Sequence, residues 1–192
     1  MSIKMDPKAD ALIVVDVQQD FCPGGALAVP EGDRVVPAIN RVLGLEDWLT
    51  VATQDWHPKD HCSFKPHGGI WPVHCVAGTT GAMFHPGLDV TKVRQIISKA
   101  TTKEAEAYSG FHETGLGALL KGQGIRRVFV CGLATDYCVK ATALDARKAG
   151  FDVIVLEDAI RGVEVKPGDC ARAVEEMKAA GIQFAKTTDL AT

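Results

Sequence analysis

The chain has 192 residues, 46% of them hydrophobic and 23% charged, which is typical of a globular protein and excludes a disordered one. The length suits a single domain over residues 1–192, and the net charge of −3, with both signs spread along the chain, argues against nucleic-acid and membrane partners. Because no signal-peptide pattern and no apolar run of roughly 18 residues occurs, we expect a cytoplasmic protein.

The first half of the chain alternates apolar strands with helical patterns. ALIVVDV, residues 11–17, predicts a buried strand, and residues 33–48 show the spacing of a helix. Residues 49–54 predict a second strand and residues 93–98 a third, which is followed by a helix near residues 113–121.

The second half continues this alternation. RRVFVCG, residues 126–132, predicts a fourth strand, and a helix runs from about residue 137 to residue 150. Residues 151–158 predict a fifth strand, residues 169–181 a helix and residues 182–185 a sixth strand. Continuous apolar strands joined by amphipathic helices are typical of parallel sheets covered on both faces. We therefore expect an α/β fold with three layers (α/β/α) and a doubly wound, mainly parallel six-stranded sheet.

Four reactive side chains stand where predicted strands end. Asp16, Asp55 and Lys99 come at the ends of the first three strands, and Cys138 follows the fourth. Ligands of such sheets bind outside the carboxyl ends of the strands, so we expect these side chains to share one pocket. The long irregular segment over residues 55–90 begins at the same edge, and loops of that length are usually functional.

Cys138 is the candidate nucleophile. A thiol at the first turn of a helix meets unpaired N–H groups and the positive end of the helix dipole, which favour thiolate. Asp16 could act as general acid and base and Lys99 could stabilise negative charge, although each alone would be an ordinary cap, ion-pair partner or surface residue. Lys103 is the weaker alternative to Lys99 because it lies past the strand end. The backbone N–H groups of Ala134 and Cys138 would form an oxyanion hole.

Histidines and a carboxylate cluster in the irregular segment. Asp55 and His57 are two residues apart, so their side chains point the same way in an extended chain, and His74 returns from the far side of the loop. His61 and His67 lie between them, and the alternative is that these loop histidines are merely solvated. Carboxylate and imidazole ligands together suit one divalent metal ion, for which zinc, iron and manganese are all candidates.

Three aromatic residues lie near these motifs in the sequence. Phe21, Trp71 and Tyr108 could simply pack in the core, or they could form a flat apolar slot for an aromatic ring. The cysteines show no CxxC spacing, so a redox dithiol or a zinc ribbon is not indicated. The roles of three loop cysteines stay open: Cys22, Cys62 and Cys75.

Five segments, taken in order over about residues 10–185, carry a family resemblance: DVQQDFCPGGALAV, TQDWHP, WPVHCVAGTTGA, ISKA followed by AYSGF, and CGLATDYCVKATALDA. They resemble the nicotinamidases (pyrazinamidases) of the isochorismatase-like hydrolase superfamily. The resemblance implies the isochorismatase-like hydrolase fold. It also implies a metal-dependent amidohydrolase that converts nicotinamide to nicotinate and ammonia through a cysteine thioester, in NAD salvage. Pyrazinamide would be a second substrate.

Carried over by position, the resemblance implies a catalytic triad of Asp16, Lys99 and Cys138. It also implies a cis peptide between Leu133 and Ala134 in the turn before the cysteine. Many members have a glycine directly after the lysine, whereas this chain has alanine there, which could alter the loop but not the charge.

The metal ligands of the family match three positions: Asp55, His57 and His74. Zinc is the metal that we expect, and whether His61 or Ser63 adds a ligand stays open. Phe21 and Trp71 match the residues that sandwich the pyridine ring, and Tyr108 would contact the substrate beside them.

Four alternatives to nicotinamide hydrolysis can be weighed from these residues. Isochorismatase-type members lack the cysteine, so Cys138 argues against them. Carbamoyl-amide hydrolases keep the cysteine but generally lack the metal cluster. A cysteine amidohydrolase for a different small amide, or a non-catalytic metal or thiol sensor on the same fold, stays open. The partner that we expect is a small-molecule substrate, and a homo-oligomer is compatible with the sequence.

Overall fold

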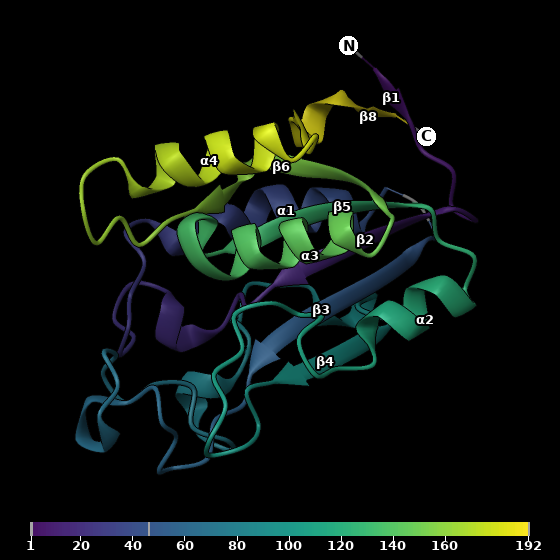
Figure 1. The fold of residues 1–192 in the computed structure, drawn as a ribbon. Helices are drawn as coiled ribbons and strands as arrows, with labels where there is room; N and C mark the ends of the chain where they lie inside the picture. The colour runs from purple at the N-terminus through teal and green to yellow at the C-terminus, as the bar shows by residue number, and fades with distance from the viewer. Residues whose placement is uncertain (1, 46, 192) are drawn as a thin grey trace.

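The computed structural model describes residues 2–45 and 47–191, and a six-stranded sheet forms its centre (Figure 1). The strand order is β4-β3-β2-β5-β6-β7, and every neighbouring pair is parallel. The strands have these bounds: β2 Asp10–Val15, β3 Leu49–Asp55, β4 Gln95–Lys99, β5 Arg127–Leu133, β6 Asp152–Arg161 and β7 Gln183–Ala185. The expected doubly wound parallel sheet is confirmed.

Helices cover both faces of the sheet. Their bounds are α1 Val35–Leu43, α2 Leu116–Gly122, α3 Lys140–Lys148 and α4 Asp169–Ala179. Side chains of a strand alternate between the two faces, so Leu12 packs in the core beside Ile39 of α1, whereas Ile13 packs in the core that holds Leu120 of α2 and Met177 of α4. The three-layer architecture follows from these two cores.

The carboxyl ends of the strands meet the long irregular segment. In Figure 1 the arrowheads of β3 and β4 point towards the loops at the lower left, which carry the residues between β3 and β4. Short 3₁₀ turns structure the loops and strand connections: Gln19–Phe21, Gly32–Arg34, Lys65–His67, Thr80–Ala82, Val90–Lys92 and Thr187–Asp189. The functional edge of the sheet is therefore bordered by ordered loop.

Several elements have shorter bounds than their sequence patterns predict. The helix expected over residues 33–48 ends at Leu43, and Gly44 caps it by donating its N–H to carbonyls of the last turn. The first strand ends at Val15 rather than at residue 17, because Asp16 has a φ of 47°, which an extended strand cannot contain. The helix expected from residue 137 begins only at Lys140, because Thr135–Val139 forms a π-helical turn.

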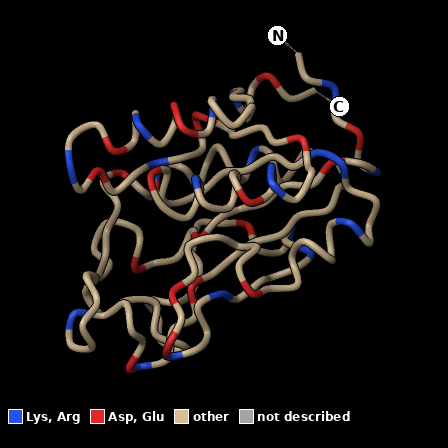
Figure 2. Tube along the Cα trace, in the orientation of Figure 1, with Lys and Arg blue, Asp and Glu red and all other residues tan. Residues whose placement is uncertain are grey.

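One pairing has no counterpart among the predicted elements. β1, Ile3–Lys4, pairs in parallel with β8, Leu190–Ala191, and so joins the two ends of the described chain. Figure 2 shows basic and acidic residues interspersed along the trace. Of the helices that the structure describes, none combines the length and the apolar character needed to cross a membrane.

Candidate active site

Three backbone features deliver the predicted triad to one place. Asp16 follows the last residue of β2 and turns its side chain inward from a left-handed backbone. Lys99 is the last residue of β4, two strands away across the sheet. Cys138 lies in the π-helical turn after β5. Because all three strands run parallel, their carboxyl ends bring these residues to the same edge.

The Lys99 ammonium is the centre of the site. Its Nζ lies 2.9 Å from Asp16 Oδ2, 2.5 Å from Asp55 Oδ1 and 3.5 Å from Cys138 Sγ. It also donates a hydrogen bond of 3.0 Å to the carbonyl of Ala107. Lys99 is only 1% exposed, so a lysine that could pass for a surface residue in the sequence is part of the protein interior.

Burial and charge compete to set the protonation of these groups. Burial favours the neutral amine, but Asp16 and Asp55 outweigh it and raise the pKa of Lys99 well above its ordinary value. Burial also acts on both acids. At Asp55 the Lys99 charge outweighs the effect of burial, so the pKa of Asp55 is lowered. At Asp16 burial outweighs the Lys99 charge, so the pKa of Asp16 is raised. The site therefore holds an ammonium, an ionised Asp55 and an Asp16 that binds a proton more readily than an ordinary aspartate.

The pKa of Cys138 is raised well above its ordinary value, which makes the expectation of a stabilised thiolate wrong. Burial is the largest cause, the Lys99 ammonium opposes it, and the nearby Asp16 and Asp55 carboxylates add to it. A helix dipole acts over a short range, and here it is outweighed by the loss of water around the sulfur. The resting sulfur is therefore a thiol, and its proton needs an acceptor.

The turn before Cys138 contains the cis peptide bond between Leu133 and Ala134 that the resemblance predicts. The carbonyl of Ala134 accepts hydrogen bonds from the N–H groups of Tyr137 and Val139, which fixes the turn. Ala134 and Cys138, the two residues predicted to form an oxyanion hole, both line the same pocket.

Asp55, His57 and His74 form a buried cluster beside the triad. The three side chains offer ligand atoms within 4.8 Å of one another, and Asp55 Oδ2 lies 3.6 Å from His57 Nε2. His57 Nδ1 contacts the Ala100 carbonyl at 3.1 Å and His74 Nδ1 the Pro72 carbonyl at 2.8 Å. A proton on each Nδ1 would satisfy these carbonyls and present both Nε2 atoms to a metal. Without an ion, burial favours the neutral ring of His57, but the carboxylate of Asp55 outweighs burial and raises the pKa of His57.

The cluster passes a further test of fit to a divalent metal. His57 Nε2 is buried, and among the described residues it has no hydrogen-bond partner, which is unusual for a polar atom without water. Burial lowers the pKa of His74, so its ring is neutral and can act as a ligand. Two imidazoles and one carboxylate match the ligand types that zinc, iron and manganese accept. These residues can therefore hold a metal ion.

His61 is occupied by other contacts. Its Nδ1 lies 2.7 Å from Ser63 Oγ and its Nε2 3.0 Å from the Ala105 carbonyl, and its ring stacks on His57 with centroids 4.1 Å apart. Both ring nitrogens are thus engaged with the protein. Lys103, the alternative to Lys99, forms an exposed ion pair with Asp60 and lies away from the triad.

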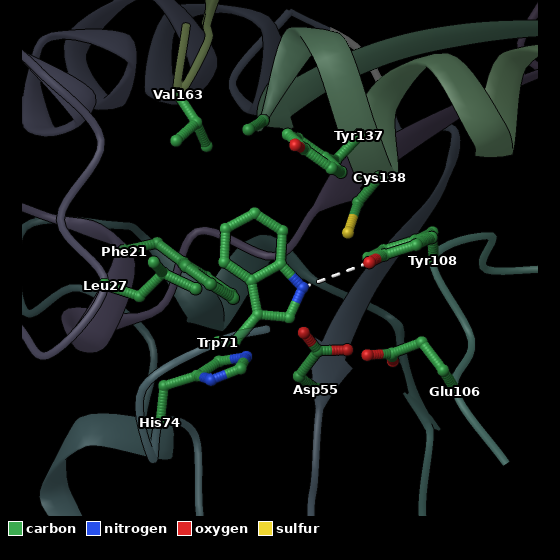
Figure 3. A pocket seen from close by; sticks show the side chains of 11 residues that line it. Phe21, Leu27, Asp55, Trp71, His74, Glu106, Tyr108, Tyr137, Cys138 and Val163 are labelled. Carbon is green, nitrogen blue, oxygen red and sulfur yellow. Dashed lines mark hydrogen bonds between the residues drawn. The ribbon is translucent and has the colours of Figure 1, made fainter. Parts of the chain in front are cut away.

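The predicted aromatic residues line the pocket above Cys138 (Figure 3). In this view the Trp71 indole lies between Phe21 and Tyr108, and it donates a hydrogen bond of 3.0 Å to the Tyr108 hydroxyl. The Tyr137 ring meets Trp71 edge-on, with centroids 5.0 Å apart. Aromatic side chains and the thiol of Cys138 therefore line the same pocket, which we call the aromatic slot.

Four residues that line this pocket are not among the site residues predicted from the sequence: Leu27, Glu106, Tyr137 and Val163. Only Tyr137, next to Cys138 in the DYC motif, had a signal in the sequence that could have found it. Cys22 and Cys75 are buried, Cys62 is half-buried, and all are free thiols, so none of these three loop cysteines forms a disulfide within the described structure.

Comparison with known proteins places the chain among relatives of this architecture. A family model described as the isochorismatase domain matches residues 10–190, nearly the whole chain. The chain belongs to the isochorismatase family. Among its family relatives is a nicotinamidase of Escherichia coli (strain K12), 41% identical over 204 residues that cover 92% of this chain and 93% of that protein.

Solved structures agree with this isochorismatase-family assignment. PnC1 from L. infantum, in complex with nicotinate, superposes with a TM-score of 0.95 at 42% identity and covers 100% of this chain and 99% of that chain. A pyrazinamidase of Pyrococcus horikoshii in complex with zinc gives a TM-score of 0.87 at 53% identity, over 92% of this chain and 98% of that chain. The fold and the family predicted from the motifs are confirmed.

Proposed function

We propose that this isochorismatase-family protein is a nicotinamidase, which hydrolyses the carboxamide of nicotinamide to nicotinate and ammonia in NAD salvage and also accepts pyrazinamide. The observation that carries the proposal is the Lys99 ammonium, in contact with Asp16, Asp55 and Cys138 below an aromatic slot. The names of the relatives support the same substrate class: a nicotinamidase, a nicotinate complex and a pyrazinamidase.

Acylation begins with the thiol proton of Cys138. Asp16 accepts this proton, and the thiolate attacks the carboxamide carbon to form a tetrahedral oxyanion. The backbone N–H groups of Ala134 and Cys138 donate hydrogen bonds to the oxyanion. Asp16 then returns the proton to the departing nitrogen, the C–N bond breaks, and ammonia leaves a thioester on Cys138. Lys99 keeps its charge throughout and limits the negative charge that builds up around the sulfur.

Deacylation uses the same groups in reverse. Asp16 takes a proton from a water molecule that attacks the thioester carbonyl, and the oxyanion rests on the same two N–H groups. When the C–S bond breaks, the sulfur regains its proton from Asp16 and nicotinate is released. Phe21, Trp71 and Tyr108 hold the ring in one plane during both steps, which keeps the reacting carbon over the sulfur.

Asp55, His57 and His74 would hold one divalent metal ion, and zinc is the metal that we propose, with iron and manganese as alternatives. A bound ion would act as a Lewis acid beside the pocket and would help to orient the nitrogen-containing ring of the substrate. The protein side chains provide the nucleophile and the proton transfers, so the two functions are separable by mutation.

We also propose that the enzyme is a cytoplasmic protein that acts on a small molecule, without a nucleic-acid or membrane partner. Six cysteines that are all free in the described structure suit a reducing compartment. The acidic and basic side chains that are interspersed in Figure 2 support this view.

Ammonia release from nicotinamide by the metal-loaded protein tests the proposed function. We expect Cys138→Ala to abolish ammonia release and to leave the metal content unchanged, because the sulfur is not among the metal ligands. Cys170→Ala is the matched control, since Cys170 is a free thiol on α4 outside the pocket, and it should keep wild-type turnover. Turnover near the wild-type level in Cys138→Ala, or none in the loaded wild type, would refute the proposal.

A further inference from the structure

Glu106 is a half-buried carboxylate that the proposed mechanism does not use. It lies in the loop between Lys99 and Tyr108 and lines the aromatic pocket. Figure 3 shows its carboxylate pointing into the pocket towards that of Asp55. One carboxylate oxygen accepts a hydrogen bond of 2.9 Å from the N–H of Ala107, which restrains the end of the side chain.

The Glu106 carboxylate also faces the histidine side of the metal cluster. Its oxygen and the ring nitrogens of His57 and His61 all lie within 4.8 Å of one another. Of these two histidines, His61 has both nitrogens engaged by Ser63 and the Ala105 carbonyl, whereas His57 Nε2 has no hydrogen-bond partner within the described structure. His57 is thus a member of two groups of candidate ligands, one with Asp55 and His74 and the other with His61 and Glu106.

The charges of the pocket are unbalanced around Glu106. The single ammonium, Lys99, is held by Asp16 and Asp55, and in the described part of the chain no lysine or arginine forms an ion pair with Glu106. Two carboxylates that face one pocket repel each other unless a cation lies near both. A divalent ion at Asp55, His57 and His74 would provide a positive charge near both carboxylates.

We propose that Glu106 belongs to the metal centre as an outer carboxylate, an inference that rests on the proposed metal site. Three protein ligands leave coordination positions for water, and Glu106 accepts a hydrogen bond from a water in one of these positions while its charge strengthens cation binding. Glu106 is more distant than the three ligands, because its oxygen is not grouped with those of Asp55 and His74. It is therefore a positioning residue.

Metal affinity in the absence of substrate tests this inference. Chelator competition with Zn²⁺ should show that Glu106→Gln weakens binding by about 10–100-fold, as loss of outer partners of metal ligands does. Glu104→Gln, an exposed glutamate of the same loop, removes the same charge from outside the pocket and should bind Zn²⁺ like the wild type. Equal affinity in Glu106→Gln and the wild type would overturn the inference.

Two further measurements distinguish a loss of metal affinity from misfolding and from an error in the proposed substrate. Glu106→Ala, measured beside Glu106→Gln, should lose affinity by a similar factor, and the Tm of both metal-free variants should match that of the metal-free wild type. Zn²⁺ binding is measured without nicotinamide, so the two proposals can fail separately. If the wild type does not hydrolyse nicotinamide but Glu106→Gln still weakens Zn²⁺ binding, only the proposed substrate is refuted. Unchanged affinity with normal hydrolysis would refute only the role of Glu106.

Discussion

Lys99 is a buried ammonium whose desolvation is offset by two carboxylates. An isolated charge in such surroundings would lose its proton, but Asp16 and Asp55 lie 2.9 and 2.5 Å from Nζ and hold the charged form. Removing one partner of a buried ion pair typically costs about 3–5 kcal/mol, because the other charge stays buried alone. The groups that we assign to catalysis are therefore also part of what stabilises the fold at this edge of the sheet.

The raised pKa of Asp16 predicts the acid limb of the activity profile. Burial, which Lys99 only partly opposes, raises the pKa of Asp16 above its ordinary value of 3.8. Asp16 must be ionised to accept the thiol proton, so kcat/KM should fall as the pH is lowered through this raised pKa, well before ordinary aspartates titrate. The pH profile of kcat/KM, with circular dichroism to confirm that the protein stays folded, measures this limb. A limb at or below 3.8 would contradict the assignment.

The residues that meet at the site could be predicted from the sequence, but their protonation states could not. The convergence of Asp16, Lys99 and Cys138 follows from a topological rule, since strand ends can be recognised from apolar runs. The protonation of Cys138 could not be predicted, because it depends on burial, which only the packed structure reveals. Glu106 lies in the charged stretch KEAE, residues 103–106, which has no apolar pattern that would indicate packing against the pocket.

At the scale of elements, the turn that carries Cys138 depends on one glycine of β5. Gly132 pairs with Val15 of β2 next to a register shift in the β5–β6 ladder, and its φ is +112°. A Cβ at this position would lie 2.1 Å from the Val15 carbonyl oxygen. Because that oxygen is backbone in a central strand, it cannot move aside as a side chain would, so only glycine lets β5 lead into the turn.

We expect Gly132→Ala to destabilise the protein far more than Gly124→Ala. Both positions have a positive φ, which costs alanine about 1–2 kcal/mol, but a Cβ at Gly124 meets no atom within 4 Å. The collision at Gly132 should add about 1–3 kcal/mol to the loss in the free energy of unfolding. Urea denaturation of both variants measures the difference, and equal midpoints would show that β2 yields to the added methyl group.

Elements with long patterns were predictable from the sequence, and short ones were not. The buried parallel strands are continuous apolar runs, so β3 and β5 lie within one residue of their predicted bounds. β1 and β8 each contain two residues, which is too short for any periodicity, and their pairing is set by the path of the chain ends. The early end of β2 depends on the left-handed backbone of Asp16, which an apolar run does not reveal.

At the scale of the whole molecule, a metal ion would tie together segments that are distant in the sequence. Asp55 ends β3, His57 follows it, and His74 comes from the far side of the long loop. The long loop is held to the rest of the chain by backbone contacts, among them the bridge between Gln18 and Phe84 and the hydrogen bond from the Cys75 N–H to Asp20. An ion bound to the folded state alone would therefore add to global stability.

Removal of the metal should lower the Tm, and Zn²⁺ should restore it. At a free ion concentration of 100 Kd the stabilisation is about 2.7 kcal/mol, which corresponds to about 5–11 °C for a chain of this size. His57→Ala should abolish the response to chelator, because it removes the ligand with the unpaired buried nitrogen. His67→Ala, an exposed histidine of the same loop, should respond like the wild type. A wild-type Tm that is the same with chelator and with Zn²⁺ would mean that these three residues do not form a metal site.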